Sequence, residues 1–230
     1  MAANNYSNLL NTLKLKFEDP AILDLAFIHR SYLNEVKSVT ASNERLEFLG
    51  DSVLSFIMSS YLFKIRPRDP EGDLTNLRSY IVKTKSLAEA AEKLNLGSYL
   101  KMSKGEEQSG GRANSQLLAN TFEALLGAVY LSLGLPAAEK VVFETLLPSF
   151  KKELQIGPPK DAKSLLQEVV QEKTKQSPHY KILKTLGPDH AKEFVVGVYV
   201  RGEKVGIGTG ASKQSAEEAA AREALGQLTK

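Results

Sequence analysis

Apolar residues recur at helical spacing through the first two thirds of the chain. Within each segment they fall at intervals of three and four residues, which is typical of one buried helix face. The pattern predicts helices over residues 6–17, 20–27, 43–66, 74–94, 115–133 and 137–154. The polar, glycine-rich residues 104–113 predict a mobile loop. No segment of residues 1–154 alternates with the two-residue period of a strand, so we expect an all-α domain.

The pattern changes after residues 155–160, a proline-containing segment that we interpret as a linker. Residues 162–173 and 213–228 are predicted helices, with three predicted strands between them. The strands cover residues 180–186, 193–201 and 204–209. The order α-β-β-β-α predicts a small sheet with two helices on one face. We therefore expect a multi-domain protein, with an all-α domain over 1–154, a linker over 155–160 and a small α+β domain over 161–230.

Three carboxylates lie on one side of the helix predicted over residues 43–66. Glu44, Glu47 and Asp51 are spaced i, i+3 and i+7, which places them within an arc of about 60°. Like charges at one-turn spacing repel one another, and each charge resists leaving water. Carboxylate oxygens are the preferred ligands of hard divalent cations, so a bound cation is the simplest compensation. The spacing predicts a metal-binding face.

Helix electrostatics offers a second interpretation of these residues. Acidic side chains in a first helical turn complement the helix dipole, and Asn43 is a candidate N-cap. This explains Glu44 and, less directly, Glu47. It does not explain Asp51, which follows Gly50 inside the helix. Because glycine is unfavourable there by about 1 kcal/mol relative to alanine, Gly50 suggests that another group approaches the helix closely.

The amino-acid composition argues against several kinds of site and of protein. The hydrophobic fraction of 42% and the charged fraction of 25% are ordinary for a soluble globular protein. The absence of cysteine excludes disulfides and cysteine-based zinc sites, and three histidines without HExxH spacing argue against a histidine-rich metal site. No charged leader precedes a long apolar run, and the apolar residues 53–63 are too few to cross a bilayer. We expect a cytoplasmic protein without membrane contact.

The stretch Asn43–Asp51, continued by Val53-Leu54, resembles the signature of the ribonuclease III family. Further blocks similar to those of the family follow the family's order, at residues 29–31, 71–74 and 118–125. Residues 161–230 resemble a double-stranded-RNA-binding domain, with hallmarks that include Leu166-Gln167-Glu168 and Ser212-Lys213. Because two multi-part matches occur in the family's domain order, the chain is identified as a member of the bacterial-type family.

The resemblance implies a metal-dependent endoribonuclease, a hydrolase that cuts double-stranded RNA and leaves 5′-phosphate and 3′-hydroxyl ends. It implies a catalytic site that contains Asp51, Glu123, Glu44 and Glu71. The metal ligands that it implies are Glu44, Asp51, Asn120, Glu123 and Glu47. Asp51 and Glu123 would bind the metal directly, Glu44 directly or through water, and Glu71 would lie farther out. The expected cofactor is Mg²⁺, with Mn²⁺ as a substitute, and no small-molecule cofactor is expected.

The resemblance also implies a homodimer, in which two all-α domains pair through the signature helix. Phe48 lies on the helix face away from the acids and is a candidate for packing into the partner chain. The alternative for Phe48 is burial in the core of its own chain. The biological role that the resemblance suggests is processing of rRNA and mRNA precursors.

Asn120 departs from the family pattern, which usually has aspartate at this position. Asparagine can offer a carbonyl oxygen to a divalent ion, but it brings no charge. It can instead orient Glu123 or a water molecule. The alternative function is therefore a double-stranded-RNA-binding protein with weak or no cleavage. A large gain of cleavage in Asn120→Asp would support that alternative, and little change would support the nuclease. A purely structural protein-interaction module, as a third possibility, would not bind duplex RNA.

The C-terminal domain carries the RNA-binding candidates. Residues 161–230 contain 11 Lys/Arg against 9 Asp/Glu within a chain of net charge +3, which permits a nucleic-acid partner without demanding one. By resemblance, the candidates are Gln167, Glu168, His190, Lys213 and Gln214. Polar side chains on the first helix suit the 2′-hydroxyls of a minor groove, and a lysine at a helix N-terminus suits phosphate. Gln214 and Glu217 stand where such domains often have lysines, so we expect a modest contribution to binding.

Overall fold

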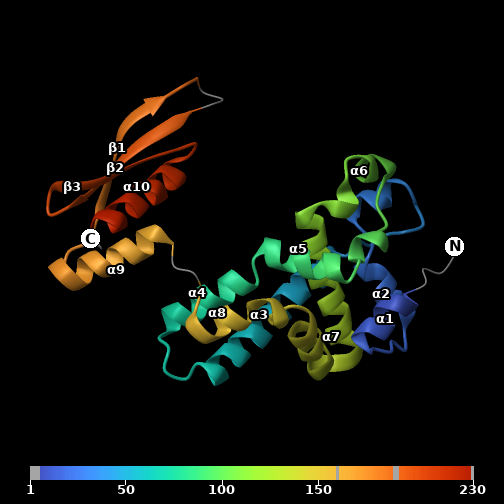
Figure 1. Ribbon diagram of the computed structural model, residues 1–230. Coiled ribbons are helices and arrows are strands. Elements are labelled where there is room, and N and C mark those ends of the chain that lie inside the picture. The colour runs from blue at the N-terminus through green and yellow to red at the C-terminus, as the bar shows by residue number, and fades with distance from the viewer. Residues whose placement is uncertain (1–5, 159–160, 189–191, 229–230) are drawn as a thin grey trace. The chain divides into compact units, whose positions relative to one another are not determined.

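The computed structural model describes residues 6–158, 161–188 and 192–228. The chain folds as two compact units, which divide between Pro158 and Pro159 (Figure 1). The first unit is helical, and the second contains a three-stranded sheet. This architecture confirms the predicted combination of an all-α domain with a small α+β domain.

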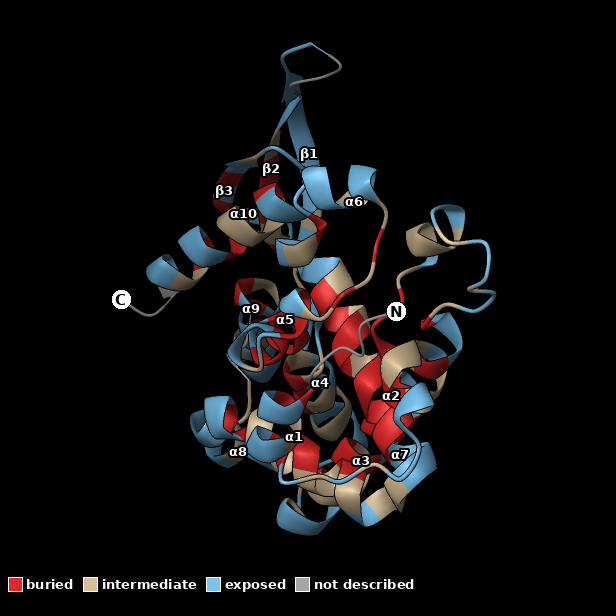
Figure 2. Cartoon of the chain, turned by 90° about the vertical axis from the view of Figure 1, so that its right-hand side faces the viewer, coloured by how far each residue is buried: buried red, intermediate tan, exposed pale blue. Residues whose placement is uncertain are grey.

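The first unit is built from α-helices joined by short 3₁₀ turns. Its elements are α1 (Ser7–Leu13), α2 (Pro20–Ala26), η1 (Arg30–Asn34), α3 (Glu44–Ile65), α4 (Glu71–Ile81), α5 (Thr84–Lys93), η2 (Leu96–Ser98), α6 (Lys104–Gln108), η3 (Gly111–Ala113), α7 (Ser115–Thr145), η4 (Leu147–Phe150) and α8 (Lys151–Ile156). Ile28 and Lys101 form a single-residue parallel β-bridge in this unit. Buried residues concentrate along α3 and α7, which form its centre (Figure 2).

Helices α3 and α7 cross with their backbones in direct contact. A Cβ atom on Gly50 would lie 1.8 Å from the carbonyl oxygen of Glu123, and one on Gly127 would lie 2.3 Å from that of Leu46. Each glycine therefore removes the side chain that would hold the helices apart. Fully buried side chains of the same two helices, such as Leu54 and Phe122, belong to the hydrophobic core of this unit.

Helices α4 and α5 replace the single helix predicted over residues 74–94. The backbone leaves the helical region at Val82 and is extended at Lys83 (φ −65°, ψ 152°). At the other end, α4 begins at Glu71, directly after Pro70, rather than at residue 74. Carboxylates in a first turn complement the helix dipole, so Glu71 and Asp73 extend the helix instead of forming a preceding turn.

Residues 104–113, predicted as a mobile loop, contain the short helices α6 and η3. The hydroxyl of Ser103 caps α6 by accepting from the backbone N–H of Glu106 (3.2 Å). Arg112 then donates to the carbonyl oxygens of Gly97 and Leu100, each over 2.9 Å. These long-range bonds fix a segment whose glycine content alone suggested irregular structure.

The predicted break after residue 133 is confirmed as a kink inside α7. Gly134 adopts φ +79° and ψ 179°, a conformation that favours glycine, and Pro136 follows it. The helix resumes and ends at Thr145, nine residues before the predicted end at residue 154. Pro148 lies in the first turn of the short helix η4, a position that proline suits better than a helix interior.

Two helices of the first unit are long and apolar enough to cross a membrane by length and composition alone, namely α3 and α7. Both pack against each other in the hydrophobic core of this unit. Core helices of globular proteins share this composition, and both helices also carry carboxylates at their crossing. We therefore interpret their apolar character as core packing.

The second unit is an antiparallel sheet with helices on one face. Its elements are α9 (Ala162–Thr174), β1 (His179–Leu186), β2 (Glu193–Val200), β3 (Glu203–Gly210) and α10 (Lys213–Leu228), with strand order β1-β2-β3. Val198 and Val200 pack against both helices. A Cβ atom on Gly208 would lie 2.1 Å from the backbone nitrogen of Ala220, so glycine lets α10 lie directly on β3. The predicted α-β-β-β-α order is confirmed.

Candidate active site

The carboxylates of two helices meet where α3 and α7 cross. Asp51 follows Gly50 on α3, and the backbone of Glu123 on α7 occupies the space beside Gly50. The prediction that Gly50 admits a close neighbour is confirmed, and this neighbour is the α7 backbone that carries Glu123. Because Gly50 has no side chain, α7 can approach α3 closely enough to bring Glu123 beside Glu47 and Asp51.

The electrostatics of the crossing show that these acids lie close together. Burial raises the pKa of Glu123 to about 7, with further contributions from the negative charges of Asp51 and then Glu47. Burial also raises the pKa of Glu47, and the charges of Glu44 and Asp51 add to this effect. The neighbouring amide of Asn120 acts in the opposite direction on the pKa of Glu47. The site therefore holds negative charge that the protein compensates only in part.

Glu44 and Glu71 occupy more peripheral positions. Glu44 accepts a hydrogen bond from Ser42 (2.8 Å), and its other oxygen lies 3.6 Å from Arg30. Its charge acts on Glu47, whereas the charges that act on Glu123 are those of Asp51 and Glu47. Glu71, in the first turn of α4, accepts from the hydroxyl of Thr75 (2.8 Å). The structure thus couples three of the predicted catalytic acids and Glu47, and it gives Glu71 a local partner.

A cavity of about 340 Å³ lies beside the acids. Its lining residues are His29, Arg30, Asn43, Glu44, Glu47, Leu100, Leu117, Asn120 and Thr121. Asn43 precedes α3 but makes no capping bond; its side-chain amide donates instead to the carbonyl of Ala26 (3.2 Å). The hydroxyl of Ser31 contacts His29 Nδ1 (2.8 Å) and accepts from the backbone of Ser103 (2.9 Å). These bonds hold the wall that faces the carboxylates.

The side chain of Asn120 is held by its neighbour one turn earlier on α7, because its Oδ1 accepts from Nε2 of Gln116 over 2.7 Å. Asn120 also lines the cavity together with Glu47, and its amide acts to lower the pKa of Glu47. The predicted carbonyl ligand is thus occupied by a protein donor in this structure. Gln116 was not among the residues singled out from the sequence. Its signal is the amide pair at i, i+4 on α7, a spacing at which helical side chains meet.

The donor set at the crossing fits a hard divalent cation. It consists of carboxylates and an amide, which are the oxygen ligands that Mg²⁺ and Mn²⁺ accept. Within residues 6–158, 161–188 and 192–228, no three His, Cys, Asp or Glu side chains are arranged as a ready-made metal cage. Mg²⁺ is usually held by one or two carboxylates and retains several waters, so such a cage is not required. The raised pKa values supply the physical reason to expect a cation there.

The second unit presents a polar groove of about 620 Å³ between the N-terminal ends of α9 and α10. Its lining residues are Asp161, Lys163, Ser164, Gln167, Ser212, Gln214, Ser215 and Glu218. Gln167 and Gln214 are therefore brought together, while Glu168 and Lys213 are exposed next to them in sequence. His190 lies outside the described residues. Glu217 holds the ammonium group of Lys163 at 2.5 Å, so one cation near this groove is already paired.

Comparisons with known proteins agree with both units. Residues 19–150 match the family model described as Ribonuclease-III-like, and residues 162–228 match the double-stranded RNA binding motif. The chain belongs to the ribonuclease III family. Ribonuclease 3 of Pelotomaculum thermopropionicum is 45% identical over 97% of this chain and 93% of that protein. Ribonuclease 3 of Protochlamydia amoebophila is 42% identical over 92% of this chain and 87% of that protein.

Solved structures extend the ribonuclease III assignment to the helical unit. A nuclease domain of ribonuclease III from Campylobacter jejuni is 38% identical with a TM-score of 0.59, and the match covers 64% of this chain and 99% of that domain. A second structure of that domain gives the same identity and TM-score. The family resemblance inferred from the sequence is confirmed. The chain is an endoribonuclease of the ribonuclease III family that acts on double-stranded RNA.

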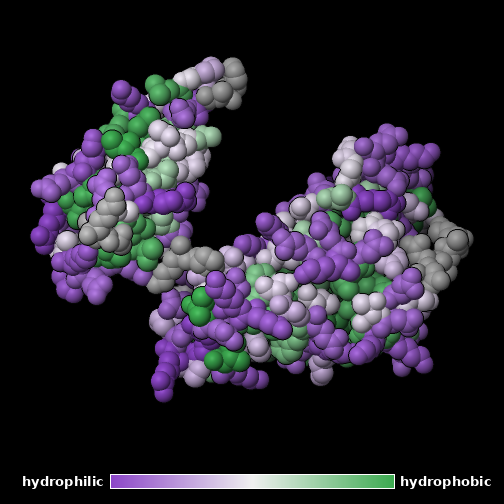
Figure 3. Space-filling view, in the orientation of Figure 1, coloured by the Kyte–Doolittle hydropathy of each residue, from purple (hydrophilic) through white to green (hydrophobic). Residues whose placement is uncertain are grey.

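Apolar side chains of this ribonuclease III chain project from α3 into solvent. Phe48 is 77% exposed, so its burial in the core of its own chain is excluded. Phe63 (73%) and Phe56 (56%) are exposed as well, and helix geometry places the three within an arc of about 80°. The surface is otherwise largely hydrophilic, with hydrophobic patches on the face shown in Figure 3. A row of exposed phenylalanines is typical of an interaction surface.

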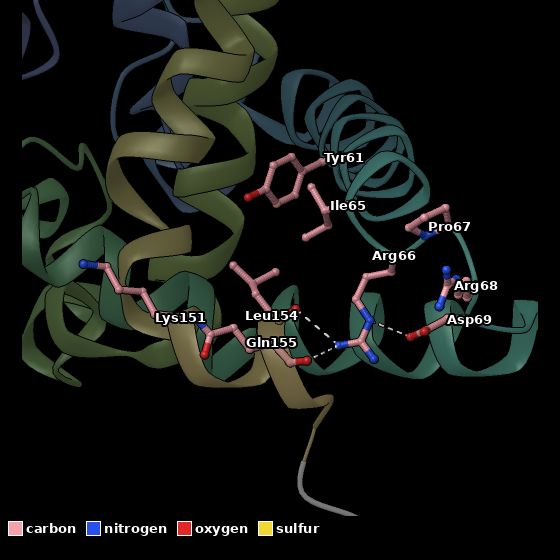
Figure 4. Close-up of a pocket in the computed structure, with 9 residues that line it drawn as sticks. All are labelled: Tyr61, Ile65, Arg66, Pro67, Arg68, Asp69, Lys151, Leu154 and Gln155. Atoms are coloured by element: carbon pink, nitrogen blue, oxygen red, sulfur yellow. Dashed lines mark hydrogen bonds and ion pairs between the residues drawn. The ribbon is translucent and has the colours of Figure 1, made fainter.

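A separate hollow of about 900 Å³ lies at the C-terminal end of α3 (Figure 4). Arg66 points into it and donates to the backbone carbonyls of Leu154 (3.2 Å) and Gln155 (3.0 Å) while pairing with Asp69 (2.5 Å). Its donors are directed at the end of α8, so they hold this helix against α3. This hollow is distinct from the carboxylate site at the other end of α3.

Proposed function

We propose that the carboxylates at the α3–α7 crossing hold a divalent cation, Mg²⁺ with Mn²⁺ as a substitute, for the hydrolysis of double-stranded RNA. The observation that carries this proposal is the state of Glu123, whose pKa is raised to about 7 by burial first and then by repulsion from Asp51 and Glu47. Protein groups leave this repulsion partly uncompensated, and a divalent cation removes it. The products carry 5′-phosphate and 3′-hydroxyl ends.

The acids have graded roles in this proposal. Asp51, Glu123 and Glu47 hold the cation, because their charges act directly on one another. Glu44 acts through its neighbour Glu47 or through water, and Glu71 lies toward the RNA. When bound, the cation lowers the pKa of a water molecule and neutralises charge that develops on the phosphodiester. Arg30, 3.6 Å from Glu44, can balance charge at the edge of the cavity.

The second unit supplies recognition of the duplex. A-form RNA is recognised mainly by shape and through 2′-hydroxyls in its shallow minor groove. Gln167 and Glu168 on α9 can hydrogen-bond to such hydroxyls, and Lys213 with Gln214 can meet phosphate at the N-terminus of α10. His190 is proposed to reach a neighbouring minor groove. The pairing of Lys163 with Glu217 limits the positive charge available and supports a modest contribution from this unit.

Two copies of the chain form the working enzyme in our proposal. The exposed Phe48, Phe56 and Phe63 provide an apolar strip on α3. Helix geometry places Phe48 about 40° from Glu44, so the strip lies beside the acidic face, whereas the sequence led us to expect Phe48 on the face away from it. One of the similar Campylobacter jejuni structures is described as showing flexibility in a region involved in dimer formation of the nuclease domain. Contact between the two strips would place one carboxylate site on each side of the dimer.

We further propose that the enzyme acts in the cytoplasm on precursors of rRNA and mRNA. The curated relatives that the chain matches over nearly its full length are named Ribonuclease 3. A binding protein with little or no cleavage is not favoured, because the chain retains Asp51 and Glu123 at the helix crossing and matches nuclease domains there.

A cleavage assay tests the proposal. Purified full-length protein should convert a long RNA duplex into short duplex fragments with Mg²⁺ or Mn²⁺, and EDTA should stop the reaction. Glu123→Gln should lower the rate by at least about 100-fold, because it removes a charged ligand. Glu144→Gln is the matched control, since Glu144 is an exposed residue of the same helix. Cleavage that persists in EDTA, or in Glu123→Gln, would refute the proposed site.

A further inference from the structure

His29 lies on the wall of the cavity beside the carboxylates, and its ring is held through one of its two nitrogens. Its Nδ1 atom lies 2.8 Å from the hydroxyl oxygen of Ser31 and accepts from the backbone N–H of Ser31 over 3.4 Å. Its Nε2 atom makes no hydrogen bond to another residue in the part of the chain that the structure describes. The half-buried ring therefore keeps one nitrogen available to a ligand in the cavity.

The hydrogen bonds at Nδ1 decide which ring nitrogen of His29 carries the hydrogen. A backbone N–H can only donate, so the bond from Ser31 requires an unprotonated Nδ1. The hydroxyl of Ser31 accepts from the backbone N–H of Ser103 over 2.9 Å, which leaves its own hydrogen to donate to Nδ1. An imidazolium, or a neutral ring with hydrogen on Nδ1, could accept neither bond. The neutral ring with its hydrogen on Nε2 satisfies every group.

The backbone around His29 is fixed from three directions. The N–H of His29 donates to the carbonyl of Lys101, and the carbonyl of His29 accepts from the N–H of Tyr32, each over 2.9 Å. The carbonyl of Ile28 accepts from the N–H of Asn43 over 2.8 Å, which ties this segment to the start of α3. A donor held in this way loses little conformational freedom when it binds a ligand.

The Nε2–H group suits an anion that shares the cavity with a cation. A neutral donor brings no positive charge, so it does not repel a cation held by the neighbouring carboxylates. Arg30 lines the same wall, so two adjacent side chains present donors there. The cavity volume of about 340 Å³ lies within the range of roughly 300–1,000 Å³ of small-ligand sites, which is enough for a phosphate group of one RNA strand.

We propose that His29 is a catalytic residue that donates from Nε2–H to a non-bridging phosphate oxygen of the RNA strand, while Ser31 holds the ring in the required tautomer. Ser31 acts through His29 and is therefore a positioning residue. The contact with RNA rests on the proposed cleavage at the carboxylate site, whereas the tautomer belongs to the free protein.

The tautomer can be tested in the full-length protein without cation or RNA. At about pH 8, where an ordinary histidine is neutral, proton–nitrogen correlation spectra distinguish protonated from unprotonated ring nitrogens. His29→Asn identifies the signals of this ring among the three histidines of the chain. We expect an unprotonated Nδ1 and a protonated Nε2, and Ser31→Ala should move both shifts toward those of an unconstrained histidine. A protonated Nδ1 in the wild type would overturn the proposal.

Two substitutions separate a donor to RNA from a backbone cap. In His29→Asn the amide oxygen can still accept from the N–H of Ser31, but the side chain is too short to reach the position of Nε2. In His29→Gln an amide N–H comes close to that position. We expect His29→Asn to lower kcat/KM for duplex RNA about tenfold or more, and His29→Gln to stay within about threefold of the wild type. Because asparagine is a favoured N-cap, thermal unfolding should show an intact fold for His29→Asn. A capping role alone predicts the reverse order of activities.

An RNA duplex with one phosphorothioate at the bond that the wild type cuts identifies the atom that His29 contacts. Sulfur accepts hydrogen bonds poorly, so the rate loss for one of the two diastereomers should be at least about threefold smaller in His29→Asn than in the wild type. Losses that arise through the cation are present in both proteins and cancel in this comparison. Equal losses in the two proteins for both diastereomers would show that His29 does not touch the phosphate.

These experiments separate a failure of this inference from a failure of the proposed function. A wild-type protein that does not cut duplex RNA with Mg²⁺ or Mn²⁺ refutes the proposed function, and the tautomer is measured without either. A wild-type protein that cuts, together with a His29→Gln variant slower than His29→Asn, refutes the role of His29 alone.

Discussion

At the residue scale, Glu123 makes stability depend on pH in an unusual direction. Its pKa is raised from an ordinary 4.5 to about 7, so between these values the folded protein holds a proton that the unfolded chain has lost. The stabilising contribution is complete below pH 4.5 and is lost as the pH rises through 7. Most paired carboxylates have the opposite effect, because their pKa values are lowered by folding.

We predict that this contribution is measurable in the cation-free protein. The free energy of unfolding in urea should fall by roughly 1 kcal/mol between pH 5 and pH 8, a value reduced for partial solvent screening. In Glu123→Gln the contribution should disappear, since glutamine does not titrate. Glu144→Gln, at an exposed position of α7, should retain it. Comparing the difference between wild type and each variant removes the effects of other groups, and an unchanged profile in Glu123→Gln would contradict the prediction.

The same proton should compete with the divalent cation. Glu123 must be ionised to hold a cation, so binding releases a proton wherever Glu123 is protonated. Below about pH 7 the affinity for Mg²⁺ should therefore fall by up to about tenfold per pH unit. Calorimetry in buffers of different ionisation enthalpy measures both affinity and proton release. An affinity that is constant from pH 5.5 to pH 7.5 would show that Glu123 is not a ligand.

The residue scale also shows what spacing can and cannot predict. The positions of Glu44, Glu47 and Asp51 follow from helix geometry and were available from the sequence. The bond between Gln116 and Asn120 was only partly available, because a spacing of four residues permits contact but does not select the amide atoms that meet. The resemblance to ribonuclease III identified the chemistry of Asn120 as unusual but could not supply its partner.

At the element scale, the crossing of α3 and α7 joins stability to the site. Gly50→Ala should destabilise the protein by about 3 kcal/mol or more and abolish cleavage, because the new Cβ atom would lie 1.8 Å from the Glu123 carbonyl. The two helices must separate, which also displaces Glu123 from Asp51. Thermal unfolding and the duplex cleavage assay measure the two effects.

Gly72→Ala is the matched control for the helix crossing. Gly72 also lies in a helix, α4, but a Cβ atom there has no neighbour within 4 Å. Alanine has the higher helix propensity, so the change should be neutral or should stabilise by up to about 1 kcal/mol. If Gly50→Ala and Gly72→Ala behave alike, the backbones of α3 and α7 are not in direct contact at Gly50.

Helices and strands could be predicted where residues within the segment determine its structure. They were harder to predict where contacts with distant residues determine it. The apolar periodicity of α3 and the proline and glycine that kink α7 are properties of the segments themselves. The break at Val82 has no proline or glycine to announce it. The segment around α6 is fixed by Arg112, which donates to the backbone carbonyls of residues 97, 98 and 100. The glycine content of this segment can be read from the sequence. The carbonyl groups that Arg112 will bond cannot, because they belong to another part of the chain.

At the scale of the whole molecule, the functions of the two units rest on different physics. The helical unit concentrates negative charge, which suits a cation and would by itself repel RNA. The smaller unit offers a polar groove in which a lysine is already paired with Glu217. Neither unit alone is strongly attractive to a polyanion. Binding of duplex RNA should therefore depend on the bound cation and on dimerisation, because a second copy of the chain doubles the number of protein–RNA contacts.

The dimer supplies the last prediction. Phe48→Glu should weaken self-association by about 100-fold or more, because it replaces a side chain whose burial contributes about 2–3 kcal/mol with a charge. Ile156→Glu is the control, since Ile156 is 69% exposed on α8 rather than on α3. Sedimentation velocity over a concentration series measures association, and thermal unfolding at low concentration should show an intact fold for Phe48→Glu, whose side chain is 77% exposed within its own chain. If Phe48→Glu and Ile156→Glu sediment identically as dimers, the apolar strip on α3 is not the dimer interface.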